Sequence, residues 1–155
     1  MKIKRSHVAG LALSASALVG LIAREGYTDK AVIPVKGDRP TVGFGSTFKE
    51  DGAPVKMGDT IKPQKAVARS LAHIQKDESK LKQCVTATLS QAEYDLMVDF
   101  AYQYGTVALC KSAIVKSAND GDYVKSCEGY LLYKKVAGYD CSTPNNKRCL
   151  GVWTR

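Results

Sequence analysis

The stretch Arg24–Thr47 constrains the fold of this chain more than any other segment. It follows sixteen residues without a charge, Val8–Ala23, so the carboxylate of Glu25 stands just past the end of an apolar segment. Two β-branched runs, Val32-Ile33 and Thr41-Val42, then flank a turn rich in Gly, Asp and Pro, which predicts a β-hairpin. A carboxylate is therefore expected where an apolar helix meets a small sheet.

The rest of the chain predicts helices and no further sheet. Apolar residues recur at helical spacing over Thr60–Cys84, with Pro63 suited to the first turn. Ser90 and Glu93 form a capping-box pattern for a helix that ends at Gly105. Two more helices are expected, over Ala108–Ala118 and from the cap Asp122 to about Lys135. The length of 155 residues suits one mostly helical α+β domain with a small N-terminal sheet.

The charge of the chain indicates an anionic partner. The net charge is +8 and the pI is about 9.3, which favours nucleic acid, anionic lipid or a negatively charged cell wall. The lysines are dispersed and no basic cluster is interleaved with aromatic residues, so nucleic acid is disfavoured.

The cysteines favour disulfides over metal ligands. Five cysteines are many for a reducing compartment, and Cys141 and Cys149 bracket a short polar loop that a disulfide would close. The other three cysteines, Cys84, Cys110 and Cys127, give at most one more pair, whose members the sequence leaves open. With two histidines and no Cys-x-x-Cys pattern, neither a metal site nor a cofactor is expected.

The N-terminal segment has the pattern of an export signal. Lys2, Lys4 and Arg5 precede the apolar core Val8–Ala23, which is rich in Ala, Gly and Ser. Cleavage near Ala17 is one possibility, and an uncleaved, weakly apolar helix that can leave the membrane is another. A buried N-terminal helix of a cytosolic protein is the third. We divide the chain into an export segment, residues 1–23, and a catalytic domain, residues 24–155.

Several short motifs in this order resemble the phage-type lysozymes of glycoside hydrolase family 24. The resemblance rests on the following segments: Glu25-Gly26, Pro40–Gly45, Leu89-Ser90-Gln91 with Phe100–Gly105, Ser112–Tyr123, and Leu150–Arg155. It implies a lysozyme-like fold with a small N-terminal sheet and a helical C-terminal lobe. It also relates residues 8–23 to the signal-arrest-release subgroup, in which the export helix is retained and the tethered enzyme stays inactive until the helix escapes.

The resemblance implies that Glu25 is the general acid that protonates the leaving oxygen of a glycosidic bond. The family's second carboxylate and its threonine would fall on Pro34 and Pro40, but one inserted turn residue restores Thr41 as the threonine. We take Asp38 as the candidate second carboxylate and Asp29 as the alternative. Glu25 and Thr41 acting without an Asp is a third possibility.

The expected function is that of an endolysin, a muramidase that hydrolyses the β-1,4 bond between N-acetylmuramic acid and N-acetylglucosamine in bacterial peptidoglycan. A lytic transglycosylase and a non-catalytic basic protein that binds wall or membrane are the alternatives. We expect a monomer that is first tethered to the inner membrane through residues 8–23 and then acts in the periplasm.

Overall fold

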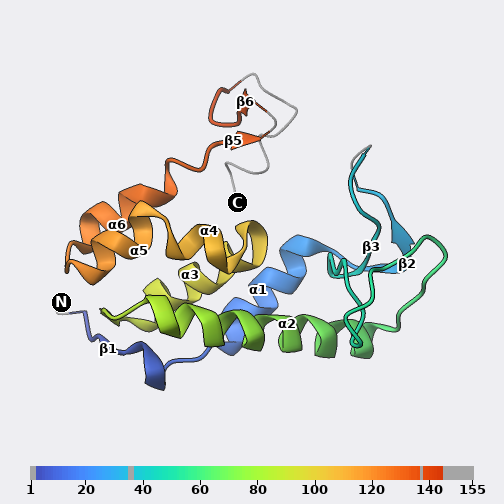
Figure 1. The fold of residues 1–155 in the computed structure, drawn as a ribbon, viewed down its shortest axis with the longest axis horizontal. Helices are drawn as coiled ribbons and strands as arrows, with labels where there is room; N and C mark the ends of the chain where they lie inside the picture. The colour runs from blue at the N-terminus through green and yellow to red at the C-terminus, as the bar shows by residue number, and fades with distance from the viewer. Residues whose placement is uncertain (1–2, 35–36, 137, 145–155) are drawn as a thin grey trace.

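The computed structural model describes residues 3–34, 37–136 and 138–144. In this part of the chain, six α-helices carry most of the fold, and three two-stranded antiparallel sheets are small. The predicted class, mostly helical α+β, is confirmed. Figure 1 shows strands β2 (Thr28–Val32) and β3 (Thr41–Gly43) at one end and the short helices at the other, with the long helix α2 (Pro63–Cys84) running between them.

The predicted hairpin forms, but its first strand begins earlier than expected. Val32 pairs with Thr41 and Thr28 with Gly43, with an irregularity between these two pairs because β2 is longer than β3. Ala31 and Val42 are buried beneath this sheet, together with Phe44 and Ile61. These side chains, with Val55 and Ala66, form the core of what we call the sheet lobe.

The helical lobe is built on a larger core. It comprises α3 (Gln91–Tyr104), α4 (Thr106–Cys110), α5 (Ala113–Asn119) and α6 (Tyr123–Tyr130), packed with α1 (Ala15–Glu25) and part of α2. Helix α2 contributes Ala66 to the sheet-lobe core and Ile74 and Leu81 to the helical-lobe core. It is therefore the structural link between the two lobes. Strands β5 (Lys135–Val136) and β6 (Tyr139–Asp140) follow the last helix.

The predicted helix caps are mostly correct. Ser90 and Glu93 form the reciprocal capping box of α3, and Gly105 ends that helix with a φ of 85°. The Asp122 side chain accepts the Lys125 N–H at the start of α6. However, α6 stops at Tyr130, because the chain turns there and Lys135 instead joins β5.

The expected single helix over Ala108–Ala118 is wrong. The structure has two helices, because Ser112 is extended (φ −78°, ψ 161°) and caps α5 by accepting the Val115 N–H. The Ser112 hydroxyl also donates to the Leu109 carbonyl at the end of α4, at 2.6 Å. One serine thus closes one helix and opens the next.

The N-terminal apolar segment is also not one helix. Ser6–His7 form β1 and pair with β4 (Thr88–Leu89), Val8–Gly10 form a single 3₁₀ turn, and α1 begins only at Ala15. Among the described residues, no helix has the length and apolar character needed to cross a membrane.

The start of α1 is fixed by polar contacts to the helical lobe. The extended Ser14 (ψ 153°) accepts the Ala17 N–H, and its own N–H and hydroxyl donate to the Asp95 carboxylate at 2.9 Å and 2.7 Å. A serine at the N-cap that accepts a backbone N–H stabilises the start of a helix. The tertiary contact therefore overrides the continuous apolar pattern.

One disulfide joins Cys84 at the end of α2 to Cys110 at the end of α4, and Cys127 is an exposed free thiol. This settles the pair that the sequence left open. Cys141 is disulfide-bonded too, but its predicted partner, Cys149, lies outside the described residues.

Candidate active site

Glu25 is the last residue of α1 and lies against the turn after β3. Gly26 ends the helix with a φ of 70°, and the Glu25 side chain is half-buried. A Cβ atom built on Gly45 would lie 3.3 Å from Glu25 Oε2, so the backbone of the turn approaches the carboxylate closely. Gly45 also has a φ of 76°, which a residue with a side chain rarely adopts. The Gly-Phe-Gly segment thus brings backbone atoms next to the candidate acid.

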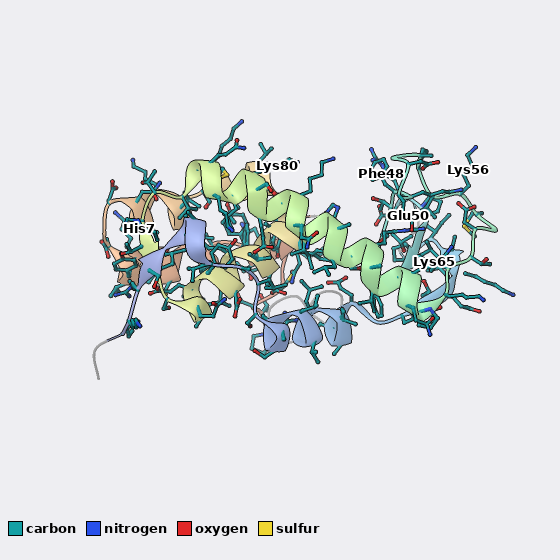
Figure 2. All side chains as sticks on the ribbon, turned by 90° about the horizontal axis from the view of Figure 1, so that it is seen from below. His7, Phe48, Glu50, Lys56, Lys65 and Lys80 are labelled. Carbon is teal, nitrogen blue, oxygen red and sulfur yellow. A yellow bond between two sulfur atoms is a disulfide. The ribbon has the colours of Figure 1, made fainter. Side chains whose placement is uncertain are left out.

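A long groove runs from this point along α2. It encloses about 1530 Å³ between the loop after β3, one face of α2 and the end of α3. Gly45 lines the groove, whereas Glu25 is not among its described lining residues and places its carboxylate beside Gly45. Figure 2 shows Phe48 and Glu50 on the loop, with Lys65 and Lys80 toward the two ends of α2.

The three other candidate residues occupy different places. Thr41 is the first residue of β3 and half-buried, with its Oγ1 3.5 Å from the Val32 carbonyl oxygen. Asp38 is exposed in the turn, where its carboxylate accepts the Arg39 N–H at 2.7 Å. Asp29 is exposed on β2 and, among the described residues, is the only one of the three that lines the groove.

Tyr102 is a site residue whose role the sequence did not indicate. Its hydroxyl donates to the Phe44 carbonyl at 2.7 Å and lies 3.4 Å from the Ser70 Oγ. The contact spans 58 residues of sequence and joins α3 to the turn that approaches Glu25. Burial raises the pKa of Tyr102, and the nearby negative charges of Glu25 and Asp77 raise it further. Tyr102 stands in the Phe100–Gly105 motif, but spacing within a helix could not show its partner.

Two further contacts hold α1 and the sheet lobe in place around the groove. Arg24, next to Glu25, forms an ion pair with Asp99 of α3, which also accepts from Gln103 at 3.4 Å. Tyr27 donates to the Ile61 carbonyl at 2.6 Å, and its ring packs against Phe44. The residues on both sides of Glu25 are therefore tied to different lobes.

Comparisons with known proteins agree with this architecture. The phage lysozyme family pattern matches residues 23–149. The endolysin of Salmonella phage P22 is 30% identical over 128 residues, which cover 83% of this chain and 86% of the relative.

Two solved structures have the same fold. The endolysin from Escherichia coli O157:H7 phage FAHEc1 superposes with a TM-score of 0.74 at 28% identity, covering 88% of this chain and 84% of the other. A variant of P22 lysozyme superposes with a TM-score of 0.71 at 29% identity, covering 84% and 88%. The chain therefore belongs to the phage lysozyme family and is a glycoside hydrolase that degrades peptidoglycan.

Proposed function

We propose that Glu25 is the general acid of the muramidase reaction and that the sugar chain binds in the groove along α2. The close approach of the Glu25 carboxylate to Gly45, which lines the groove, carries this assignment. A protonated carboxyl in that position donates to the leaving oxygen, and a positioned water attacks the other face of the sugar.

Thr41 and Asp38 are proposed to position or activate that water, as their place in the hairpin after Glu25 suggests. An inverting glycosidase separates its two carboxyl groups by about 6.5–9.5 Å to admit the water. The Asp38 carboxylate already accepts the Arg39 N–H within the turn. Asp29 on the groove therefore remains the alternative base.

The test is lysis combined with product analysis. We expect Glu25→Gln to lower the turbidity-clearing rate on permeabilised cells at least about a hundredfold, the usual contribution of a general acid. The melting temperature should stay equal or rise, because active-site residues are often kept against stability. Mass analysis of wild-type products should find reducing sugar ends. Anhydro ends would identify a transglycosylase, and substantial activity of Glu25→Gln would refute the acid assignment.

We further propose that the enzyme is an endolysin that is exported and tethered by residues 8–23 and acts after release, as a monomer in the periplasm. The contacts of the docked segment support a soluble end state. Leu11, Leu13 and Leu18 pack on the helical-lobe core. The Leu13 N–H donates to Glu78 at 2.8 Å, and Gln91 donates to the Ala12 carbonyl at 2.8 Å.

Two glycines provide a test of tethering. A Cβ at Gly10 would meet nothing within 4 Å, and one at Gly20 would meet only the flexible end of Arg24 at 3.8 Å. Gly10→Leu with Gly20→Leu should therefore strengthen membrane retention while leaving the Ser14 cap intact. We expect the variant in the membrane fraction, with delayed lysis. A mature N-terminus after Ala17, or an unchanged periplasmic fraction, would contradict tethering. Size-exclusion chromatography checks the monomer.

A further inference from the structure

The groove has a regular line of cationic side chains on one face of α2. Lys62, at the N-cap, begins the line, and Lys65, Arg69, Lys76 and Lys80 continue it. The imidazole of His73, whose Nε2 lies 3.1 Å from Asp77 Oδ2, occupies the turn between Arg69 and Lys76. With His73 included, the spacings are three, four, four, three and four residues, which average one residue per helical turn. At 1.5 Å per residue the line is about 27 Å long. We call these Lys and Arg side chains the cationic line.

The cationic line is not a random sample of the helix charges. Of the Lys and Arg residues from Lys62 to Cys84, only Lys82 does not line the groove, and it lies over the Tyr94 ring instead. The small side chains of Ala68 and Ala72 lie between the cations on the same face. The groove wall is therefore basic and open along most of the helix.

Part of the positive charge is not neutralised. Arg69 pairs with Glu50 at 2.8 Å, and Lys80 lies 4.0 Å from Asp77. Within the described part of the chain, no carboxylate lies within ion-pair distance of Lys62, Lys65 or Lys76, all of which are exposed. Three cations thus face the groove available for a ligand.

The backbone of peptidoglycan is a chain of N-acetylated sugars without charge. It therefore offers no ionic partner to the cationic line. The peptides attached to the muramic acid residues carry carboxylates at regular intervals along the chain. We propose that the cationic line is a binding site for the carboxylates of these stem peptides. The inference rests on the proposed placement of the glycan in the groove.

The anionic residues of the groove favour a peptide over a phosphate polymer. Asp29, Glu50 and Asp77 lie among the cations. Stem peptides that contain a diamino acid carry both amines and carboxylates and match such a mixed surface. A polymer with one phosphate per repeat has no ammonium group for every carboxylate of the groove, and therefore matches this mixed surface less well.

The experiment compares two substrates with three proteins. The substrates are intact sacculi and sacculi from which an amidase has removed the stem peptides. The proteins are the wild type, Lys65→Gln with Lys76→Gln, and the control Lys116→Gln with Lys125→Gln. The control removes the same charge from exposed positions on α5 and α6 outside the groove. The readout is kcat/KM from released reducing ends.

We expect Lys65→Gln with Lys76→Gln, the line variant, to lose about tenfold on intact sacculi, equivalent to about 1.4 kcal/mol, and a distinctly smaller factor on stripped glycan. The control should match the wild type on both substrates. An equal loss on both substrates, or an equal loss in the control, would overturn the site. Equal wild-type kcat/KM values on intact and stripped sacculi would also overturn the site.

A separate binding measurement distinguishes a failure of this inference from a failure of the proposed function. Each Lys pair is combined with Glu25→Gln, and co-sedimentation with intact and stripped sacculi is measured without cleavage. Weaker binding of the line variant to intact sacculi alone supports the site even if the acid is misassigned. Weaker binding only to stripped walls that still carry teichoic acid would instead identify a phosphate site and refute the proposal. If the wild type releases reducing ends from neither substrate, the proposed function fails, and this arm still decides the peptide site.

Discussion

The two hydrophobic cores of the molecule differ in size and in what they support. Among the described residues, fifteen buried side chains form the helical-lobe core, and six form the sheet-lobe core. The candidate acid, the hairpin and the glycine turn all belong to the neighbourhood of the smaller core. The larger core instead holds the N-terminal segment and helices α3 to α6.

The difference indicates that stability and chemistry are supplied by different parts of the chain. The smaller lobe is tied to the larger one by α2, by the Tyr102 hydroxyl and by the Arg24–Asp99 ion pair. Regions with fewer buried apolar contacts open at lower free energy, and binding loops are commonly drawn from them. The groove between the lobes is thus placed where small movements are least costly.

The strongest test of this difference between the two cores replaces one isoleucine in each of them. Ile74 is 1% exposed in the helical lobe and Ile61 is 7% exposed in the sheet lobe. We expect Ile74→Ala to lower the free energy of unfolding by about 3–5 kcal/mol and Ile61→Ala by about 2 kcal/mol, because the smaller core collapses more readily around a cavity. Denaturant titration measures both.

Activity should respond in the opposite order. Ile61 lines the groove, so Ile61→Ala should reduce lysis more than Ile74→Ala below the unfolding transition. If the two variants lose equal stability and equal activity, the lobes behave as one unit and the contrast is wrong.

Substitutions of the three hairpin candidates test which side chain of the sheet lobe takes part in the chemistry. We expect Thr41→Ala to lower kcat about a hundredfold, the low end of a general acid–base contribution. Asp38→Ala should be comparable or milder, and Asp29→Ala the mildest. Initial rates of reducing-end release provide the measurement.

A matched control tests the turn role of Asp38. Asp51 also accepts a backbone N–H in an exposed turn, that of Ala53 at 2.9 Å, so Asp51→Ala reports the cost of losing such a contact. An effect of Asp38→Ala no larger than that of Asp51→Ala would remove Asp38 from the site. If Asp29→Ala is the most damaging, the second carboxylate is Asp29.

Tyr102 connects the two regions through one hydrogen bond. Tyr102→Phe should lower kcat about three- to tenfold with little change in KM, since a neutral hydrogen bond contributes about 0.5–1.5 kcal/mol. The Phe44 carbonyl loses its donor, and the turn beside Glu25 is held less firmly. Ser70→Ala is the control, because it removes only the 3.4 Å contact and keeps the bond to Phe44. A pure KM effect would point to lost substrate contact instead.

The smallest effect is expected at the edge of the larger lobe, where Arg5 and Glu93 form an ion pair at 2.6 Å. Burial opposes ionisation of Glu93, but hydrogen bonds from Arg5 and Ser90 lower its pKa overall. A lowered carboxyl pKa adds stability above the unfolded pKa, near 4.5, and this stability is lost as the pH falls through the folded value.

Glu93→Gln should therefore lower Tm at pH 7 by about 2–4 °C, and the difference from wild type should vanish in acid. Calorimetry between pH 7 and pH 3 measures this. The exposed Glu128→Gln on α6 is the control. A Tm difference that persists unchanged at pH 3 would mean that packing of the cap, and not the charge, stabilises this edge.

Local interactions explain which parts of the fold the sequence predicted. The capping box of Ser90 and Glu93, the Gly105 stop and the Asp122 cap depend on partners within four residues, so spacing alone indicated them. The strand Thr41-Val42 and the position of Glu25 at a helix end were predicted for the same reason. The role of Glu25 came from the resemblance, since a carboxylate at a helix end has no unique chemistry.

By itself, then, the sequence determined the elements whose ends are capped locally and the order of the motifs around Glu25. Only the tertiary structure decided that a strand and a 3₁₀ turn precede the first α-helix, that Cys84 pairs with Cys110, and that Tyr102 meets Phe44. It also decided that the cations of α2 face the groove. The physical reason is distance along the chain. The contacts of Arg5 with Glu93 and of Ser14 with Asp95 join residues 88 and 81 positions apart, and no local pattern encodes such partners.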